Sequence, residues 1–413
     1  MPIVINEKRL MSELEALAAI SELEPPAITR IVYSEADRRA REWFRSLCDE
    51  AGLSVRIDAI GNVFVRWEGS EPKLAAIGTG SHIDAIPHAG AYDGTVGVLG
   101  GLEAIRALKE SGLKLQRSIE LLLFTAEEPT RFGIGCFGSR LLAGTLDGGA
   151  GERLKAPDGA TLNELRDAAG YKGTVESVRL PADYYAGFVE LHIEQGPLLE
   201  REGIPIGIVT NIAAPSGLRI TIEGEGGHAG ALLMPYRKDA FCAAAEIVLA
   251  VERSAKGTSA IDTCGTVGKC SIHPGAVNSV PSKVQMEVDV RDTDEKRRDR
   301  VLAQIRETCA DVEARRGVKV EIEVVNADAP AESSPVIIDA ISQSADELDL
   351  RWKKMVSRAY HDSLFMARIA PMAMIFIPCR DGISHRPDEY AKPEDIANGV
   401  RVLARTIAKL AEA

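Results

Sequence analysis

The sequence lacks the features that place a protein in or on a membrane. It contains no apolar run long enough to span a bilayer, and its first residues, Met-Pro-Ile-Val-Ile-Asn-Glu-Lys-Arg-Leu, include no apolar core of signal-peptide length. An excess of basic residues is also absent, since the formal net charge is −12. Nucleic acids and anionic membranes attract basic surfaces, so we expect neither as a partner. We predict a cytoplasmic protein.

A cysteine framework is lacking as well. The seven cysteines are scattered along the chain, and no two of them form a Cys-x-x-Cys pair. An odd, scattered set predicts neither a network of disulfides nor a cysteine-based metal site. We expect reduced thiols buried in the core.

The length of 413 residues is too great for one ordinary core, so the chain is expected to form two domains. Its outer segments, residues 1–212 and 330–413, alternate helices with apolar strands and predict an α/β fold with a mostly parallel sheet. Residues 213–329 instead follow the order β-α-β-β-α-β, which is typical of a ferredoxin-like α+β unit. We therefore predict a ferredoxin-like domain inserted into an α/β domain.

The stretch from residue 76 to 94 brings His82, Asp84 and Asp93 close together in sequence. The apolar run 74–77 precedes them, which predicts a buried strand followed by a glycine-rich loop. Imidazole and carboxylate groups at the end of a strand are a typical arrangement of metal ligands. One such cluster is weak evidence for a metal site, because a single His-x-Asp sequence occurs by chance.

Three later segments add candidate ligands. Glu127 and Glu128 follow an apolar strand at 118–125, His192 lies in a strand at 188–196, and His385 follows a strand at 372–378. Open α/β sheets place their sites at the carboxyl ends of such strands. The candidate ligands are His82, Asp93, Glu128, His192 and His385. This set suits two divalent ions about 3.5–4 Å apart, with Glu127 as the general base on a bound water. Each histidine alone fits an ordinary structural role, but chance is a poor account of the whole set.

Further polar residues each have two interpretations. His228, in a Gly-rich loop, is either an exposed turn residue or a donor to an oxyanion. Asn278 and Arg291 offer an amide and a guanidinium, and Arg291 either binds a substrate carboxylate or is an exposed residue at a strand end. Tyr360 and His361 precede a predicted helix and can contact a polar substrate, whereas in the alternative interpretation this segment only supplies a helix cap, Asp362 or Ser363.

Taken together, these motifs resemble those of the di-metal amidohydrolases of the aminoacylase/carboxypeptidase superfamily, and within it the carbamoylase/allantoate amidohydrolase branch. The motifs are Gly-Ser-His-Ile-Asp at 80–84, Tyr-Asp-Gly at 92–94, Glu-Glu at 127–128, His-Ile-Glu-Gln-Gly-Pro at 192–197, Gly-His-Ala-Gly at 227–230, Asn-Ser-Val-Pro at 278–281, Asp-Val-Arg-Asp at 289–292, His-Asp at 361–362 and Ser-His at 384–385. They occur in the order of the family and cover nearly the whole chain.

Within this branch the segment 357–368 is similar to the ureidoglycolate amidohydrolases. Carbamoylases and allantoate amidohydrolases usually carry a glycine where this chain has Tyr360. The resemblance implies hydrolysis of ureidoglycolate to glyoxylate, ammonia and carbon dioxide during allantoin breakdown. The alternatives are an allantoate amidohydrolase or an N-carbamoyl-L-amino acid hydrolase, for which the larger space beside a glycine would be needed.

The resemblance also implies roles for the residues that match. It implies that Asp93 bridges two metal ions, that Glu127 is the acid/base and that Asp84 orients His82. The implied substrate contacts are Gln195, Asn278, Arg291, Tyr360 and His361. His228 is implied to reach the site of the second subunit, because the inserted domain forms the dimer in this family. Manganese is the implied metal, whereas ligand chemistry alone allows zinc or cobalt.

Overall fold

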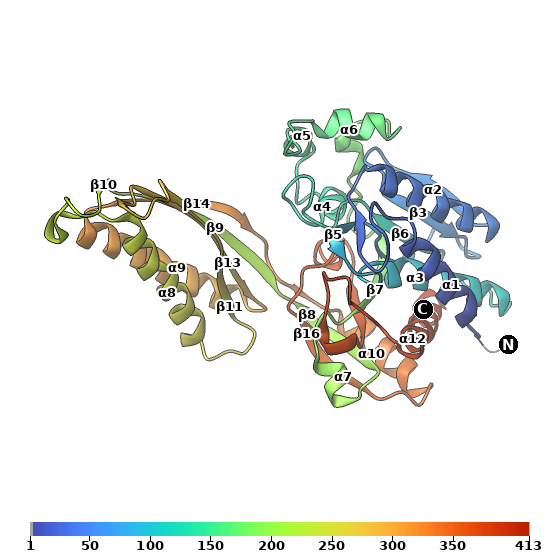
Figure 1. Ribbon diagram of the computed structural model, residues 1–413. Coiled ribbons are helices and arrows are strands. Elements are labelled where there is room, and N and C mark those ends of the chain that lie inside the picture. Colours follow the sequence, from blue (N-terminus) through green and yellow to red (C-terminus); the bar gives the residue numbers. More distant parts are fainter. Residues whose placement is uncertain (1–2, 413) are drawn as a thin grey trace. The chain divides into compact units, whose positions relative to one another are not determined.

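The computed structural model describes residues 3–412, which form two units (Figure 1). The first unit contains residues 3–210, 332–357 and 361–412, and the second contains residues 211–331 and 358–360. Among the described helices, none combines the length and the apolar character that crossing a membrane requires. Each unit has a hydrophobic core of its own.

The first unit is organised around a nine-stranded sheet. In sheet order its strands are β15 (Ala331–Glu332), β8 (Ile206–Ile212), β17 (Met372–Ile377), β7 (Tyr185–Ile193), β4 (Ala76–His82), β6 (Ile119–Phe124), β3 (Val63–Trp67) and β2 (Ser54–Ile57), with β16 (Trp352–Ser357) paired to β8. A separate antiparallel pair joins β1 (Ile28–Arg30) to β5 (Ala85–Ala89).

The mixed α/β class is confirmed, but the expectation of a mostly parallel sheet is wrong. Only the four central strands, β17, β7, β4 and β6, are parallel to one another. Strands β3 and β2 on one side and β8 on the other pair antiparallel. The four central strands are buried throughout except at Ala186 of β7, as parallel strands covered on both faces should be, whereas β2 is largely exposed.

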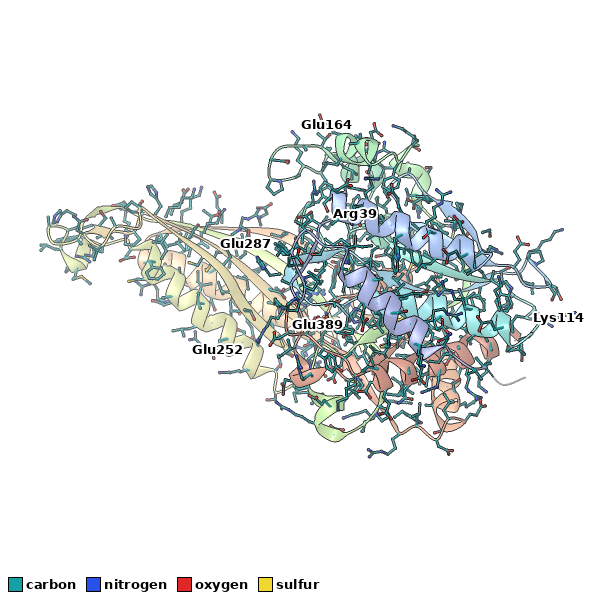
Figure 2. The ribbon with its side chains drawn as sticks, turned by 45° about the vertical axis from the view of Figure 1, so that its right-hand side comes forward. Arg39, Lys114, Glu164, Glu252, Glu287 and Glu389 are labelled. Carbon is teal, nitrogen blue, oxygen red and sulfur yellow. The ribbon has the colours of Figure 1, made fainter. Side chains whose placement is uncertain are left out.

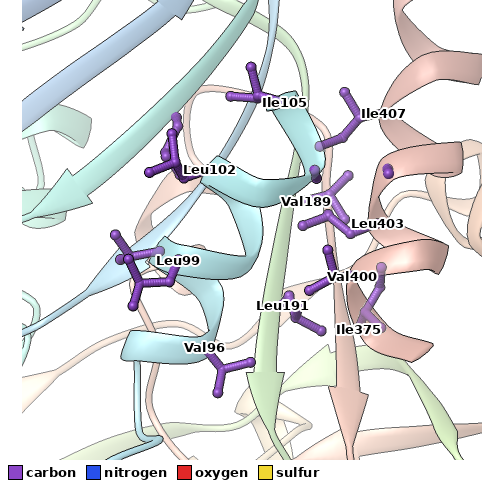
Figure 3. Close-up of a cluster of buried hydrophobic side chains, with 14 of the residues drawn as sticks. Val96, Leu99, Leu102, Ile105, Val189, Leu191, Ile375, Val400, Leu403 and Ile407 are labelled. Carbon is purple, nitrogen blue, oxygen red and sulfur yellow. The ribbon is translucent and has the colours of Figure 1, made fainter. Parts of the chain in front are cut away.

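Helices α3 (Thr95–Glu110) and α12 (Pro393–Glu412) pack together on this sheet, as Figure 3 shows. Helices α1 (Glu7–Ala18) and α10 (Pro335–Asp346) pack against them. The core side chains that Figure 3 labels are Val96, Leu99, Leu102 and Ile105 of α3, Val400, Leu403 and Ile407 of α12, and Val189, Leu191 and Ile375 of the sheet. Such burial of branched apolar side chains is the main stabilising contribution to a fold.

The remaining helices of the first unit are shorter, apart from α2 (Glu35–Glu50). As predicted, Ser34 caps α2, and its hydroxyl accepts a hydrogen bond from the amide of Asp37. The others are α4 (Phe137–Ala143), α5 (Gly148–Glu152), α6 (Leu162–Ala168), α7 (Leu198–Glu202) and α11 (Ser363–Met366), with 3₁₀ turns at Val175–Val178 and Arg380–Gly382. Helix α11 contacts β7 and β17, so it lies beside the strands that carry the site.

Strand β4 is longer than expected. We predicted a strand at 74–77 and a glycine-rich loop after it, but the strand runs from Ala76 to His82. Its glycines serve close packing within the sheet, since a Cβ atom added at Gly80 would lie 2.1 Å from the carbonyl oxygen of Leu122. His82 is therefore the last residue of a rigid, buried strand rather than part of a loop.

Replacing Gly80 by alanine should destabilise the first unit. The added Cβ atom would meet main-chain atoms of β6, which cannot move aside as a flexible side chain can. We expect the free energy of unfolding to fall by about 3 kcal/mol, as for an overpacked core. The matched control is Gly151→Ala in α5, where the nearest atom to the added Cβ is 3.5 Å away. Urea unfolding would test this, and equal midpoints for the two variants would contradict it.

The second unit has the strand and helix order β9 (Ala214–Glu223), α8 (Ala240–Gly257), β11 (Cys264–His273), β13 (Lys283–Asp292), α9 (Glu295–Arg316) and β14 (Lys319–Ala327). Its four-stranded sheet has the order β11-β13-β9-β14, and all three pairings are antiparallel. This is the β-α-β-β-α-β arrangement. Apolar side chains of both helices pack on the sheet and form the core of this unit. A short pairing of β10 (Gly227–His228) with β12 (Ser279–Val280) and a 3₁₀ turn at Met234–Tyr236 complete it.

The cysteines are free, but not all of them are buried. Cys48, Cys136, Cys309 and Cys379 are buried thiols, as expected. Cys242, Cys264 and Cys270 of the second unit are exposed, so the expectation of a wholly buried set is wrong. A small, weakly polar side chain can occupy an exposed helix or strand position at little cost, and sequence pattern does not reveal this.

Candidate functional site

The candidate ligands of the first unit meet at one edge of its sheet. His82 is the last residue of β4, and His192 is the last but one of β7. Glu127 and Glu128 follow the end of β6, and His385 lies in the loop after β17. Because these four strands are parallel, their carboxyl ends lie on the same edge. The sheet topology thus brings together residues that are up to three hundred positions apart.

Asp93 lies at the centre of this cluster. Its Oδ1 atom is 3.5 Å from Nε2 of His82 and 3.2 Å from Nε2 of His192. Its Oδ2 atom is 3.3 Å from Nε2 of His385, which in turn is 3.4 Å from Oε1 of Glu128. Two groups with the spacing of metal ligands result, one with His82 and His192 and one with Glu128 and His385, and they share Asp93.

Main-chain hydrogen bonds orient two of the imidazoles in these groups. Nδ1 of His82 is 2.9 Å from the carbonyl oxygen of Asp84, and Nδ1 of His192 is 2.8 Å from that of Ile193. A carbonyl only accepts, so both Nδ1 atoms carry the hydrogen. The amide of Gly94 donates to Nε2 of His192 at 3.2 Å, which marks that nitrogen as an acceptor. With Nδ1 held by a main-chain carbonyl in both rings, Nε2 is the ring nitrogen that lies beside Asp93, and metal sites commonly orient imidazoles in this way.

The separations are also those of a coordination sphere. Tetrahedral ligands with bonds of about 2.0–2.1 Å lie roughly 3.3–3.4 Å from one another. The atoms around Asp93 are separated by 3.2–3.5 Å. Imidazole nitrogens and carboxylate oxygens are donors that zinc, manganese and cobalt accept. The residues present therefore fit divalent metal ions.

Electrostatics in the site follows from its concentration of buried carboxylates. Burial alone would lower the pKa of His82, yet the charges of Glu127 and Asp93 outweigh it and raise the pKa well above its ordinary value. The hydrogen bond with Asp93 raises the pKa of His385 to about 9. Burial would raise the pKa of Asp93, but the three imidazoles hold it well below its usual range. The cluster thus attracts positive charge from solution.

Glu127 has the environment of a proton-transfer group. Its Oε2 atom lies 3.8 Å from Nε2 of His82, and its Oε1 atom accepts a hydrogen bond from the thiol of Cys136 at 3.2 Å. Burial and the negative charges of Glu128 and Asp362 raise its pKa well above the ordinary value, although His82 opposes the shift. A carboxylate in such surroundings can accept and return a proton at neutral pH.

Asp84 connects the end of β4 with the loop after β6. Its carboxylate accepts hydrogen bonds from the amides of Glu127 at 3.3 Å and of Glu128 at 3.1 Å. The Asp84 carboxylate was expected to orient His82. Instead, the main-chain carbonyl of Asp84 accepts the hydrogen bond from Nδ1 of His82, and Oδ1 of the carboxylate is 3.8 Å from this nitrogen. The Asp84 carboxylate does not orient His82 because it accepts hydrogen bonds from these two amides.

Several residues of the site have a strained main chain. Ala126, Cys136, Gln195 and His385 all adopt positive φ angles between 54° and 58°. This left-handed conformation is uncommon for residues other than glycine and costs energy. Its recurrence in the segments that carry Glu127 and the candidate ligand His385 is typical of segments whose conformation is set by function.

The comparison with known proteins decides the family. The pattern of Peptidase family M20/M25/M40 matches residues 78–409. This chain belongs to that family. The match covers the whole site described above, including the loop that carries His385. Members of the family are metal-dependent, in agreement with the ligand groups around Asp93.

Close relatives of this M20 chain extend over its whole length. The ureidoglycolate hydrolase of Oryza sativa subsp. japonica is 52% identical over 416 residues, which cover 99% of this chain and 86% of that protein. A protein called AtUAH, solved in complex with glyoxylate, is 51% identical, with a TM-score of 0.90 and 99% of both chains covered. The same protein has been solved with (S)-hydroxyglycine. A hydantoinase/carbamoylase family amidase from Burkholderia multivorans is 35% identical, with a TM-score of 0.89 and 100% and 99% of the two chains covered.

Two of the predicted substrate contacts lie beside the M20 ligand cluster. Nε2 of Gln195 donates to Oδ2 of Asp93 at 2.6 Å, while its Oε1 atom is buried and has no hydrogen-bond partner among the described residues. The ring of His361 packs edge-on against that of His192, with centroids 4.6 Å apart, and its Nε2 atom is 3.0 Å from the hydroxyl of Ser357. The free oxygen of Gln195 can receive a donor from a ligand.

The other predicted contacts belong to the second unit and stay predictions. His228, on β10, and Asn278 are exposed. The guanidinium of Arg291 pairs with the carboxylate of Asp289, with Nη2 and Oδ2 2.9 Å apart. The hydroxyl of Tyr360 donates to the carboxylate of Asp328. Arg291 is thus already paired with the carboxylate of Asp289 on its own strand. A substrate carboxylate would have to compete with this ion pair.

Sequence motifs missed three residues around the site. Glu389 accepts hydrogen bonds from the amides of Tyr92 and Asp93, and Cys136 donates to Glu127. Glu190 accepts from the hydroxyls of Ser81 at 2.8 Å and Ser363 at 2.6 Å. A carboxylate inside the apolar strand β7 was a signal that could have found Glu190. Glu389 and Cys136 carry no comparable signal.

Proposed function

We propose that this protein is a di-metal hydrolase that cleaves the ureido amide of ureidoglycolate, giving glyoxylate, ammonia and carbon dioxide. The observation that carries the chemistry is the shared position of Asp93 between two ligand groups, with Glu127 beside them. The choice of substrate is supported by the ureidoglycolate hydrolase that is 52% identical and by the related structure with glyoxylate.

In this proposal His82 and His192 would hold one ion and Glu128 and His385 the other, and Asp93, which both groups share, would contribute to each. The proposed metal is manganese, with zinc or cobalt as alternatives. When bound, two such ions polarise a carbonyl group and lower the pKa of a water. The fit of the donor atoms and their 3.2–3.5 Å separations support this assignment.

The chain itself moves the proton. Since Oε1 of Glu127 is bonded to the thiol of Cys136, its Oε2 atom is the one that faces the ligand cluster. Glu127 takes a proton from the water that attacks the ureido carbonyl. It then gives this proton to the terminal nitrogen, so that the C–N bond breaks and ammonia leaves. The remaining carbamate loses carbon dioxide, and the resulting hydroxyglycine eliminates a second ammonia to give glyoxylate.

Substrate recognition is assigned to residues of both units on the basis of sequence. Arg291 and Asn278 are proposed to bind the substrate carboxylate, since a planar guanidinium matches a carboxylate with two hydrogen bonds. His228 is proposed to stabilise the oxyanion in the site of a second subunit. This assignment requires a homodimer formed through the second unit. Gln195 and His361 are proposed to contact the reacting end, which the buried, unpartnered oxygen of Gln195 supports.

The substrate assignment predicts a clear order of activities. With manganese added, we expect ammonia release from ureidoglycolate to exceed that from allantoate or N-carbamoyl-L-amino acids by at least about tenfold, which corresponds to 1.4 kcal/mol of transition-state binding. The proposed reason is that this chain has Tyr360 where carbamoylases and allantoate amidohydrolases usually carry a glycine, and a ring leaves less space for a larger substrate. Equal or faster turnover of allantoate would overturn this choice and favour the allantoate amidohydrolase alternative.

The variant Tyr360→Gly isolates this effect from the rest of the site. It should raise the ratio of allantoate to ureidoglycolate turnover, whereas Tyr360→Phe, which keeps the ring, should leave the ratio unchanged. The ratio is the informative quantity, because a general loss of stability lowers both activities together.

A further inference from the structure

Glu389 binds the main chain of the segment that carries Asp93. Its Oε1 atom accepts hydrogen bonds from the amides of Tyr92 at 2.8 Å and of Asp93 at 3.0 Å. The residue, labelled in Figure 2, is only 5% exposed and lies almost three hundred positions from these partners. Buried amides without an acceptor are costly, so Glu389 fixes where the Asp93 main chain can lie.

The second oxygen of Glu389 leads to the Asp93 side chain. Oε2 is 2.9 Å from the hydroxyl of Ser384, and this hydroxyl is 2.7 Å from Oδ2 of Asp93. Gln195 supplies a further donor to the same Oδ2 atom at 2.6 Å. One carboxylate therefore reaches the Asp93 main chain directly and the Asp93 carboxylate through one hydroxyl. The same Oδ2 atom of Asp93 is also the one that lies 3.3 Å from Nε2 of His385.

The packing around Glu389 leaves it little freedom. A Cβ atom added at Gly90 would lie 2.3 Å from Cβ of Glu389, so the two segments are in close contact. A side chain held this tightly can orient its partners, since its own rotamer is fixed by packing.

We propose that Glu389 is a positioning residue that holds Asp93 in the orientation needed to serve both ligand groups. This inference rests on the proposed di-metal function. A carboxylate that serves two ions must present its oxygens in two fixed directions, and rotation about its side-chain bonds would remove one of them. Of the two carboxylate oxygens of Asp93, Ser384 contacts only Oδ2, so its effect is expected on the group with Glu128 and His385. Outer residues of this kind typically change metal affinity about 10–100-fold.

The test measures manganese binding to the protein by calorimetry and by metal analysis after dialysis. We expect Glu389→Ala to weaken manganese binding about 10–100-fold. Glu389→Gln should stay within about threefold of the wild type, because its amide oxygen still accepts from both amides and its amino group can donate to Ser384. Ser384→Ala should weaken the binding of one of the two ions and leave the binding of the other unchanged. The matched control is Glu394→Ala, an exposed carboxylate at the start of α12.

The outcomes separate this inference from the function beneath it. Equal manganese affinity for Glu389→Ala and Glu394→Ala would overturn the inference, as would a Glu389→Gln variant as weak as Glu389→Ala. If Glu389→Ala does not fold, Ser384→Ala still decides, because unchanged binding of both ions would contradict the role of the Ser384 contact. A wild type that binds no divalent ion would instead overturn the proposed metal site. A wild type that binds two ions but cleaves another amide would leave the inference intact.

Discussion

Replacing Glu127 by glutamine is expected to abolish measurable turnover while the metal content stays at the wild-type level. General acid–base catalysis contributes about 10²–10⁴-fold, and here one group serves both proton transfers. Glutamine has the same shape and its amide oxygen can still accept from the thiol of Cys136, so the site should keep its geometry. What is lost is the ability to bind and release a proton. Ammonia release and metal analysis on the same sample measure both effects.

The neighbouring carboxylate provides the contrast. Glu128 faces His385 at 3.4 Å and belongs to a ligand group, so Glu128→Gln should lose metal together with activity. An amide oxygen is a weaker ligand than a carboxylate for a divalent ion. Full activity of Glu127→Gln would refute its role in proton transfer. Loss of metal in that variant would show that it is a ligand instead.

The sequence predicted the parts of the site that depend on the direction of buried strands. Apolar runs before Glu127, around His192 and before His385 predicted strands whose carboxyl ends share an edge, and the central strands are parallel. The order of the outer strands was not accessible in this way. Short alternating strands such as β2 and β3 show that one face is buried, but not which neighbour they pair with or in which direction.

The groups that the sequence missed act through main-chain atoms or through weak donors. Glu389 accepts hydrogen bonds from two main-chain amides. Every residue other than proline has such an amide, so the residue types in the sequence do not reveal the contact. Asp84 was expected to orient His82 through its carboxylate, but the carboxylate accepts from two amides, and the main-chain carbonyl of Asp84 accepts from His82. Side-chain motifs thus predicted which residues gather around Asp93, whereas the contacts that orient them required coordinates.

Asp93→Asn is expected to remove binding of both metal ions and to reduce turnover to background. Asp93 is the one residue common to the two ligand groups, so its loss should affect both, while His385→Asn should affect one. Asparagine keeps the size and one oxygen of the side chain, but not the negative charge that Asp93 presents to the three imidazoles. Metal analysis after dialysis should find two ions in the wild type, about one in His385→Asn and none in Asp93→Asn.

Thermal unfolding gives a second readout that does not depend on activity. A ligand present at 100 times its dissociation constant stabilises the folded protein by about 2.7 kcal/mol, so manganese should raise the unfolding temperature of the wild type. This rise should disappear in Asp93→Asn and be partly retained in His385→Asn. A variant Asp93→Asn that keeps two ions, or that manganese stabilises as much as the wild type, would show that Asp93 is not shared between them. Since both proposed ions depend on Asp93, its replacement is the most demanding test of the di-metal site.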